Sequence, residues 1–228
     1  MALYLCGGGS GKQIFDAMLK FSNEINKNNP ILYVPLAMDE NKYDSCYKWF
    51  ESEIKQVDLK EFEMVRSKEE LSKKDFSSYS AIFIGGGNTY KLLSDIKACS
   101  NYEKIVEYIK NGGTVFGGSA GAIIFGKDID CCSLDDKNKI GLKDTRGFNL
   151  LSDYSILCHL KNKNFRKNRK FLEEFSKKEK VIYLPEEDVI VIDNGKISMI
   201  GAKKYIVFKN GRYEYHSFAN LKKDMITK

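Results

Sequence analysis

The sequence predicts an α/β fold with a parallel, helix-covered sheet and antiparallel strands in its last third, and three observations predict it. Short apolar runs alternate with longer amphipathic stretches up to about residue 125. Such β-α-β-α alternation is typical of a parallel sheet between helices. The last third instead holds short strand-like runs separated by Asn-Gly turns. Finally, glycine clusters at 85–87 and 117–118 each follow an apolar run, which is where ligands of parallel sheets bind.

The first half of the chain supplies the strands and helices of the predicted sheet. Short apolar runs predict strands at 3–6, 31–36, 59–65, 79–84 and 115–116. Apolar residues at helical spacing predict helices at 13–21, 43–57, 90–98 and 103–110. In this order a predicted helix connects most of the strands to the next one, as parallel pairing requires.

The last third is expected to extend this sheet with antiparallel strands. Strand-like runs occur at 154–158, 181–185, 189–192, 196–200, 206–208 and 212–216. The turns Asp-Asn-Gly at 193–195 and Lys-Asn-Gly at 209–211 predict two hairpins.

Length and composition favour one globular domain spanning residues 1–228, without an internal repeat or a Pro/Gly-rich linker. The net charge of +6 comes mostly from lysine, and in 161–180 the lysines alternate with acids. That mixture is typical of a solvated helix face, so we do not expect a nucleic-acid partner. No apolar run is long enough to cross a membrane, so no membrane partner is expected either.

The cysteines and the first residues favour a cytoplasmic protein. Residues 1–6 lack the basic and apolar regions of a signal peptide and lead directly into a glycine loop. The six cysteines include no C-x-x-C pair, so we expect reduced thiols. With only two histidines we expect no histidine-rich zinc site and no metal. The oligomeric state, monomer or homodimer, is left open.

Ser119 lies in Gly117-Gly118-Ser119-Ala120-Gly121, a G-x-S-x-G pattern between a strand-like run and an apolar helical run. This pattern is typical of a nucleophile elbow, a strand-to-helix turn that exposes the serine hydroxyl. Its glycines are needed because side chains there would collide across the turn. The N-terminus of the following helix would face the place where an oxyanion develops.

Two other glycine segments resemble nucleotide-binding loops but lack key positions. In residues 6–13, Cys6 replaces the first glycine of a P-loop and Gln13 replaces its Ser/Thr, so we interpret the segment as a flexible first βα turn. In residues 85–90, Tyr90 replaces the third glycine of a dinucleotide fingerprint. We therefore expect no cofactor.

A nucleophilic serine needs a base, and the base needs an orienting acid. His159 directly follows a strand-like run, so it is expected at the same sheet edge as the elbow. His216 ends the last hairpin strand and is expected to be a surface or packing residue. Candidate acids follow the run 181–184, at Glu186, Glu187 and Asp188.

These segments together resemble the serine peptidase family of aspartyl dipeptidase (peptidase E), which includes cyanophycinase. Residues 82–93, Ile-Phe-Ile-Gly-Gly-Gly-Asn-Thr-Tyr-Lys-Leu-Leu, resemble its G-G-G-N-T segment, and residues 115–122 resemble its G-x-S-A-G-A elbow. Residues 147–151 followed by His159 resemble its G-L-G-L-L…P-H stretch. Residues 184–187 lie where the family carries its third triad member.

The resemblance implies a three-layer parallel-sheet sandwich of flavodoxin-like or class I glutamine amidotransferase-like type. It implies Ser119 as nucleophile, His159 as general base and Glu187 as the acid, with Glu186 a close second. It also implies an oxyanion hole made by the backbone N–H groups of Gly87 and Ala120.

The chain departs from the family pattern on both sides of His159. Cys158 and Leu160 stand where the family commonly has a proline and an aromatic residue. Peptidase E selects an N-terminal aspartate, which requires a cation beside the carboxylate. Lys161, Arg166 and Arg169 are the candidate cations.

The sequence thus predicts a cytoplasmic serine peptidase that acts on short peptides, as a dipeptidase with Asp-X specificity left open. An esterase of α/β-hydrolase type, using His216 with an acid such as Asp188, is one alternative. A non-catalytic binding protein on the same scaffold is another.

Overall fold

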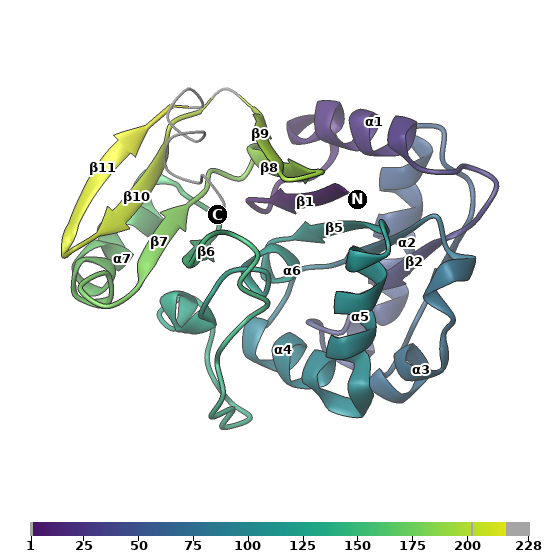
Figure 1. Cartoon of the computed structure of the whole chain (residues 1–228), viewed down its shortest axis with the longest axis horizontal. Coiled ribbons are helices and arrows are strands. Elements are labelled where there is room, and N and C mark those ends of the chain that lie inside the picture. The colour runs from purple at the N-terminus through teal and green to yellow at the C-terminus, as the bar shows by residue number, and fades with distance from the viewer. Residues whose placement is uncertain (1, 202, 218–228) are drawn as a thin grey trace.

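The computed structural model describes residues 2–201 and 203–217, and its largest element is a seven-stranded sheet (Figure 1). The strand order is β3-β2-β4-β5-β1-β8-β9. The first five strands in this order are parallel, and β8 and β9 continue the sheet in antiparallel register. The strands are β1 (Ala2–Cys6), β2 (Ile31–Val34), β3 (Phe62–Met64), β4 (Ala81–Ile84), β5 (Thr114–Gly118), β8 (Val189–Asp193) and β9 (Lys196–Ile200). The predicted parallel α/β sheet is therefore confirmed.

Helices cover both faces of this sheet because its strands are apolar on both sides. Alternate residues of one strand enter different cores: Leu3 and Leu5 of β1 pack on one side, and Tyr4 packs on the other. The first core contains residues of α3 (Lys68–Lys73), α4 (Thr89–Lys97) and α5 (Asn101–Lys110). The second contains residues of α1 (Phe15–Glu24) and α2 (Tyr43–Lys55). The result is a three-layer sandwich.

The predicted strands of the last third divide between two sheets instead of extending one. A second sheet has the order β11-β10-β7-β6, with strands β6 (Tyr154–Leu157), β7 (Lys180–Tyr183), β10 (Tyr205–Lys209) and β11 (Arg212–His216). Helix α7 (Asn162–Phe175) joins β6 to β7, which are parallel, and lies beside this sheet (Figure 1). Only β8 and β9 form the expected antiparallel extension of the large sheet.

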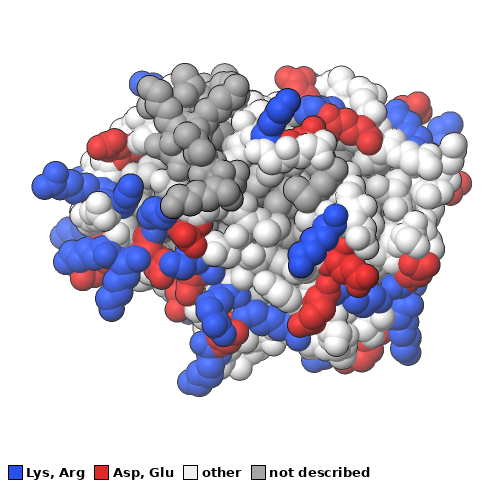
Figure 2. Space-filling view, viewed as in Figure 1, with Lys and Arg blue, Asp and Glu red and all other residues white. Residues whose placement is uncertain are grey.

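The lysine-rich segment after residue 160 is mostly the solvated helix α7, as its mixed charges predict. Arg169 pairs with Glu173 one turn along the helix, and Lys167 pairs with Asp135. Figure 2 shows basic side chains gathered over this side of the molecule, with acidic groups between them. No helix among the described residues has the length and apolar character needed to cross a bilayer.

Asp188 carries a fully buried carboxyl group and directly precedes β8. Its Oδ1 accepts a hydrogen bond from the backbone N–H of Lys203, at 3.4 Å, but Oδ2 has no partner among the described residues. Gly201 approaches so closely that a Cβ there would lie 2.1 Å from Oδ1. Burial, with a smaller contribution from the charge of Glu187, raises the pKa of Asp188 from an ordinary 3.8 to about 6.

This buried carboxyl group makes the free energy of unfolding depend on pH. Because the native state holds the proton more tightly than the unfolded chain, the stabilisation is full below about pH 4 and is lost as pH rises through about 6. The amide side chain of the Asp188→Asn variant cannot ionise. We therefore expect the Tm of Asp188→Asn minus the Tm of wild type to increase as the pH rises from about 4.5 to about 7.5.

Thermal unfolding followed by circular dichroism at several pH values checks this expectation. Asp193→Asn is the matched control, because Asp193 ends the same strand but is partly exposed. Its Tm difference from wild type should stay constant over the same range. A constant difference for Asp188→Asn as well would contradict the assignment.

Candidate active site

At the elbow, three backbone segments approach one another so closely that only glycine fits where they meet. A Cβ on Gly117 would lie 2.3 Å from the carbonyl oxygen of Gly121, and a Cβ on Gly121 would lie 2.1 Å from the carbonyl oxygen of Ile84 in β4. Gly118 faces open space, so its position has no such requirement. The two outer glycines of the G-x-S-x-G pattern are therefore the ones that the turn needs.

Ser119 has the strained backbone typical of a nucleophile elbow, with φ 52° and ψ −114°. Its N–H donates to the carbonyl oxygen of Cys6 in β1, at 3.1 Å. Its own carbonyl oxygen accepts from the N–H groups of Ala122 and Ile123 in α6 (Ala120–Ile123). These three bonds hold the serine between β1 and α6.

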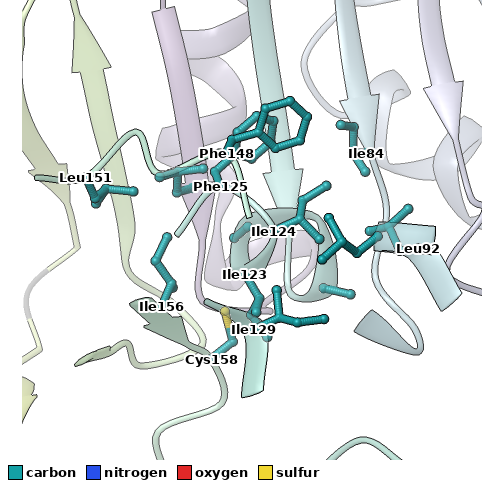
Figure 3. Close-up of a cluster of buried hydrophobic side chains, with 14 of the residues drawn as sticks. Ile84, Leu92, Ile123, Ile124, Phe125, Ile129, Phe148, Leu151, Ile156 and Cys158 are labelled. Atoms are coloured by element: carbon teal, nitrogen blue, oxygen red, sulfur yellow. The ribbon is translucent and has the colours of Figure 1, made fainter. Parts of the chain in front are cut away.

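The short helix α6 is anchored by an apolar cluster (Figure 3). Its residue Ile123 and the following Phe125 are buried, and the Phe125 ring stacks on Phe148 with the ring centroids 4.8 Å apart. Ile156 of β6 and Leu92 of α4 belong to the same cluster. The packing of α6 thus links the elbow to both sheets.

His159 follows β6 and lies beside Ser119, as the order of the segments predicted. Its Nε2 is 2.8 Å from Ser119 Oγ. The backbone of His159 is held by an N–H bond to the carbonyl oxygen of Gly7, at 2.9 Å, and by the Asn164 side chain, which donates to the His159 carbonyl oxygen. The imidazole is partly exposed, so a substrate can reach it.

Glu186, not Glu187, contacts the imidazole. Glu186 Oε1 lies 3.0 Å from His159 Nδ1, whereas Glu187 points to Lys203, with 3.5 Å between Oε1 and Nζ. The expectation from sequence preferred Glu187, and the turn after β7 directs the earlier carboxylate inward instead. Because an ionised carboxylate can only accept, Nδ1 must donate to Glu186, and Nε2 is then free to accept the Ser119 hydroxyl proton.

Lys161 holds the second oxygen of Glu186, with 2.6 Å between Nζ and Oε2. Burial raises the pKa of Glu186, but the hydrogen bonds from Lys161 and His159 together outweigh it and keep the pKa below its ordinary value. Glu186 is therefore ionised at neutral pH. Lys161 was a candidate cation for a substrate carboxylate, but in the structure it pairs with Glu186.

The glycine loop after β1 is packed against His159 and the 185–186 segment and is not the flexible turn that the sequence suggested. A Cβ on Gly8 would lie 2.2 Å from His159 Cε1, and a Cβ on Gly7 would lie 1.8 Å from the carbonyl oxygen of Pro185. Gly9 donates its N–H to the carbonyl oxygen of Glu186, at 2.7 Å. Three consecutive glycines signalled this close packing, but only the partners in the fold explain it.

The predicted oxyanion-hole segments flank the serine. Ala120 is the residue after Ser119, and a Cβ on Gly86 would lie 3.1 Å from Ser119 Cβ, which places the Gly86–Gly87 backbone beside the hydroxyl. Within residues 2–201 and 203–217, the N–H groups of Gly87 and Ala120 have no hydrogen-bond partner. A pocket of about 610 Å³ opens next to Ser119.

The alternative base and acid do not meet the serine. His216 lies in β11 at the edge of the second sheet, where its ring packs near Tyr205 and Nε2 is 3.5 Å from Glu214. Asp188 is enclosed next to Gly201, as described above. In the described part of the chain, no three His, Cys, Asp or Glu side chains gather as a possible metal site.

Comparison with known proteins agrees with this geometry. Residues 3–200 match the sequence profile of peptidase family S51. The chain belongs to this family. As a member of peptidase family S51 it is a serine peptidase, and its relatives carry matching names.

Two relatives illustrate the range of similarity within family S51. Peptidase E of Nostoc is 26% identical over 210 residues, which cover 84% of this chain and 81% of that protein. An uncharacterized peptidase of Listeria monocytogenes is 31% identical over 125 residues. That alignment covers 54% of this chain and 58% of the Listeria protein, less than two thirds of its length.

Two solved structures share the family S51 fold. One is a peptidase E candidate from Listeria monocytogenes, with a TM-score of 0.71 and 22% identity over 89% of this chain and 98% of that one. The other is a peptidase from an acI-B1 actinobacterium, with a TM-score of 0.72 and 19% identity over 94% and 93% of the chains. The predicted flavodoxin-like, amidotransferase-like architecture is therefore confirmed.

The contact between Gly8 and the imidazole generates a testable prediction. In Gly8→Ala the new methyl group must displace the His159 ring, because a Cβ there would lie 2.2 Å from Cε1. Since misplacement of a reacting group by about 1 Å can cost roughly 100-fold in rate, we expect kcat/KM to fall by about that factor.

Gly112→Ala is the control, because Gly112 also has a positive φ, of 92°, but a Cβ there would meet nothing within 4 Å. It shares the backbone strain of Gly8→Ala and should keep its activity. Peptide hydrolysis and Tm are measured for both variants. Equal activity of Gly8→Ala and Gly112→Ala would show that the loop does not position the imidazole.

Proposed function

We propose that this S51 peptidase hydrolyses short peptides through a triad of Ser119, His159 and Glu186. The observation that carries the proposal is the continuous chain of contacts from Ser119 Oγ to His159 Nε2, at 2.8 Å, and from His159 Nδ1 to Glu186, at 3.0 Å. The small pocket beside Ser119, about 610 Å³, suits a short substrate.

In this proposal, Ser119 Oγ attacks the carbonyl carbon of the scissile bond while His159 Nε2 takes the hydroxyl proton. The imidazolium that forms is stabilised by ionised Glu186 at Nδ1. When the tetrahedral intermediate collapses, Nε2 gives the proton to the leaving amine and an ester to Ser119 remains. Water, deprotonated by the same nitrogen, then hydrolyses the ester and restores the serine.

The N–H groups of Gly87 and Ala120 are proposed to bind the oxyanion of both tetrahedral intermediates. Their lack of partners among the described residues supports this role, as does the position of their segments on either side of Ser119. Donors fixed at such a position typically contribute about 3 kcal/mol each to the transition state.

Replacement of the nucleophile tests the reaction class. Ser119→Ala is expected to lose hydrolysis of a dipeptide and tripeptide panel, and to lose covalent labelling by diisopropyl fluorophosphate, because Ser119 carries the hydroxyl that is paired with His159. Rates by chromatography and labelling by intact-mass spectrometry check this. Hydrolysis that persists in Ser119→Ala would sink the proposal.

The two neighbouring glutamates provide a matched test of the acid. Glu186→Gln keeps the shape of the side chain but removes the charge that fixes the imidazole tautomer, so we expect kcat to fall by roughly 10³–10⁴-fold. Glu187→Gln, one residue along the same turn, should remain within a few-fold of wild type. The reverse ranking would assign the acid to Glu187.

A further inference from the structure

The pocket beside Ser119 lies among the carboxyl ends of the central strands, the glycine loop after β1 and helix α2. Its polar lining includes the backbone of the glycines and the side chains of Ser10, Lys42, Ser45 and Ser119. Its other walls are largely apolar and aromatic. These walls include Ile14, Met38, Tyr33, Trp49, Phe83 and Phe116.

The aromatic residues pack against one another and form the floor of the pocket. The Phe83 ring stacks on Phe116, with ring centroids 4.8 Å apart, and Trp49 stands 6.2 Å from Phe83 in an edge-on arrangement. Tyr33 stacks on Phe50 of α2, with the ring centroids 4.2 Å apart. A ligand in this pocket therefore meets the surfaces of rings that already pack against one another.

Charge is nearly absent from this lining. Among the described residues around the pocket, Lys42 is the only charged one, and it is exposed just before α2. The cations suggested by the sequence do not line it: Lys161 pairs with Glu186, and Arg169 lies over the Tyr213 ring. Arg166 is exposed on α7 and is not a lining residue either.

The position of His159 indicates which part of a substrate enters the pocket. Gly8 lines the pocket, and a Cβ added to Gly8 would meet the imidazole, but His159 itself does not line the pocket. The leaving amine must reach His159 Nε2 to receive its proton. The pocket is thus on the side of the residue whose carbonyl carbon Ser119 attacks.

We infer that this pocket binds a large apolar or aromatic side chain on the acyl side of the scissile bond, and that an aspartate is disfavoured there. The inference rests on the proposed peptidase function. Burial of such a side chain against the aromatic floor is favourable in proportion to its apolar area. An aspartate carboxylate would lose its hydration and face the negative faces of the rings, with only a solvated lysine at the rim.

Aminoacyl 4-methylcoumarinyl-7-amides test the inference, because they share one leaving group and differ only in the acyl residue. We expect kcat/KM for Phe, Leu or Met to exceed that for Asp by about 100-fold or more, the range in which apolar pockets discriminate. A preference for Asp, lost in Lys42→Met, would overturn the inference and assign the pocket to an acidic side chain.

A filled pocket supplies the second test. Ser45 lines the pocket but is exposed on α2, so Ser45→Trp can occupy it without disturbing the core. We expect kcat/KM for the Phe substrate to fall about 10-fold or more relative to the Ala substrate. Lys48→Trp, on the same helix and outside the lining, is the matched control and should keep the wild-type ratio. An unchanged ratio in Ser45→Trp would also overturn the inference.

Labelling by diisopropyl fluorophosphate separates this inference from the proposed function. A wild-type protein that is labelled at Ser119 but prefers Asp or shows no acyl preference refutes the apolar pocket alone. A protein that is not labelled and cleaves no substrate refutes the serine mechanism and, with it, the inference. A Ser45→Trp variant that is still labelled at Ser119 but selectively loses hydrolysis of the Phe substrate supports both the mechanism and the inference.

Discussion

The backbone of Ser119 is held in a conformation that an unconstrained chain avoids, and the geometry of the site depends on what holds it there. A positive φ costs a non-glycine residue roughly 1–3 kcal/mol. Here the cost is offset by the bond from Ser119 N–H to β1 and by the two α6 amides on its carbonyl oxygen. Since β1, β5 and β4 are neighbours in the sheet, the hydroxyl is fixed to the centre of the fold.

The glycine loop after β1 places the other two groups relative to that centre. Each of its three glycines meets a different partner: Gly7 meets Pro185, Gly8 meets the imidazole, and Gly9 binds the Glu186 backbone. No larger residue fits at these contacts without movement of the partner. The loop therefore sets the distance between the large sheet and the segments that carry His159 and Glu186.

The sequence was sufficient for the elements that depend on local chemistry. Ser119 lies in a pattern whose glycines are required by the turn itself, and His159 was one of only two histidines. The choice between Glu186 and Glu187 was not accessible, because adjacent carboxylates differ only in the direction that the turn gives them. The second sheet was also missed, since periodicity identifies a strand but not the sheet that it joins.

The division of the strands between two sheets also divides the proposed triad. Ser119 is carried by the large sheet, whereas His159 and Glu186 follow β6 and β7, adjacent parallel strands of the small one. The proposed base and acid therefore follow strands of one sheet, and the proposed nucleophile follows a strand of the other. The bonds His159 N–H to Gly7 O and Gly9 N–H to Glu186 O join segments of the two sheets. A relative motion of the two sheets would lengthen the contact between Ser119 and His159 but leave the contact between His159 and Glu186 intact. The Ser119–His159 contact is therefore the one that is most sensitive to such a motion.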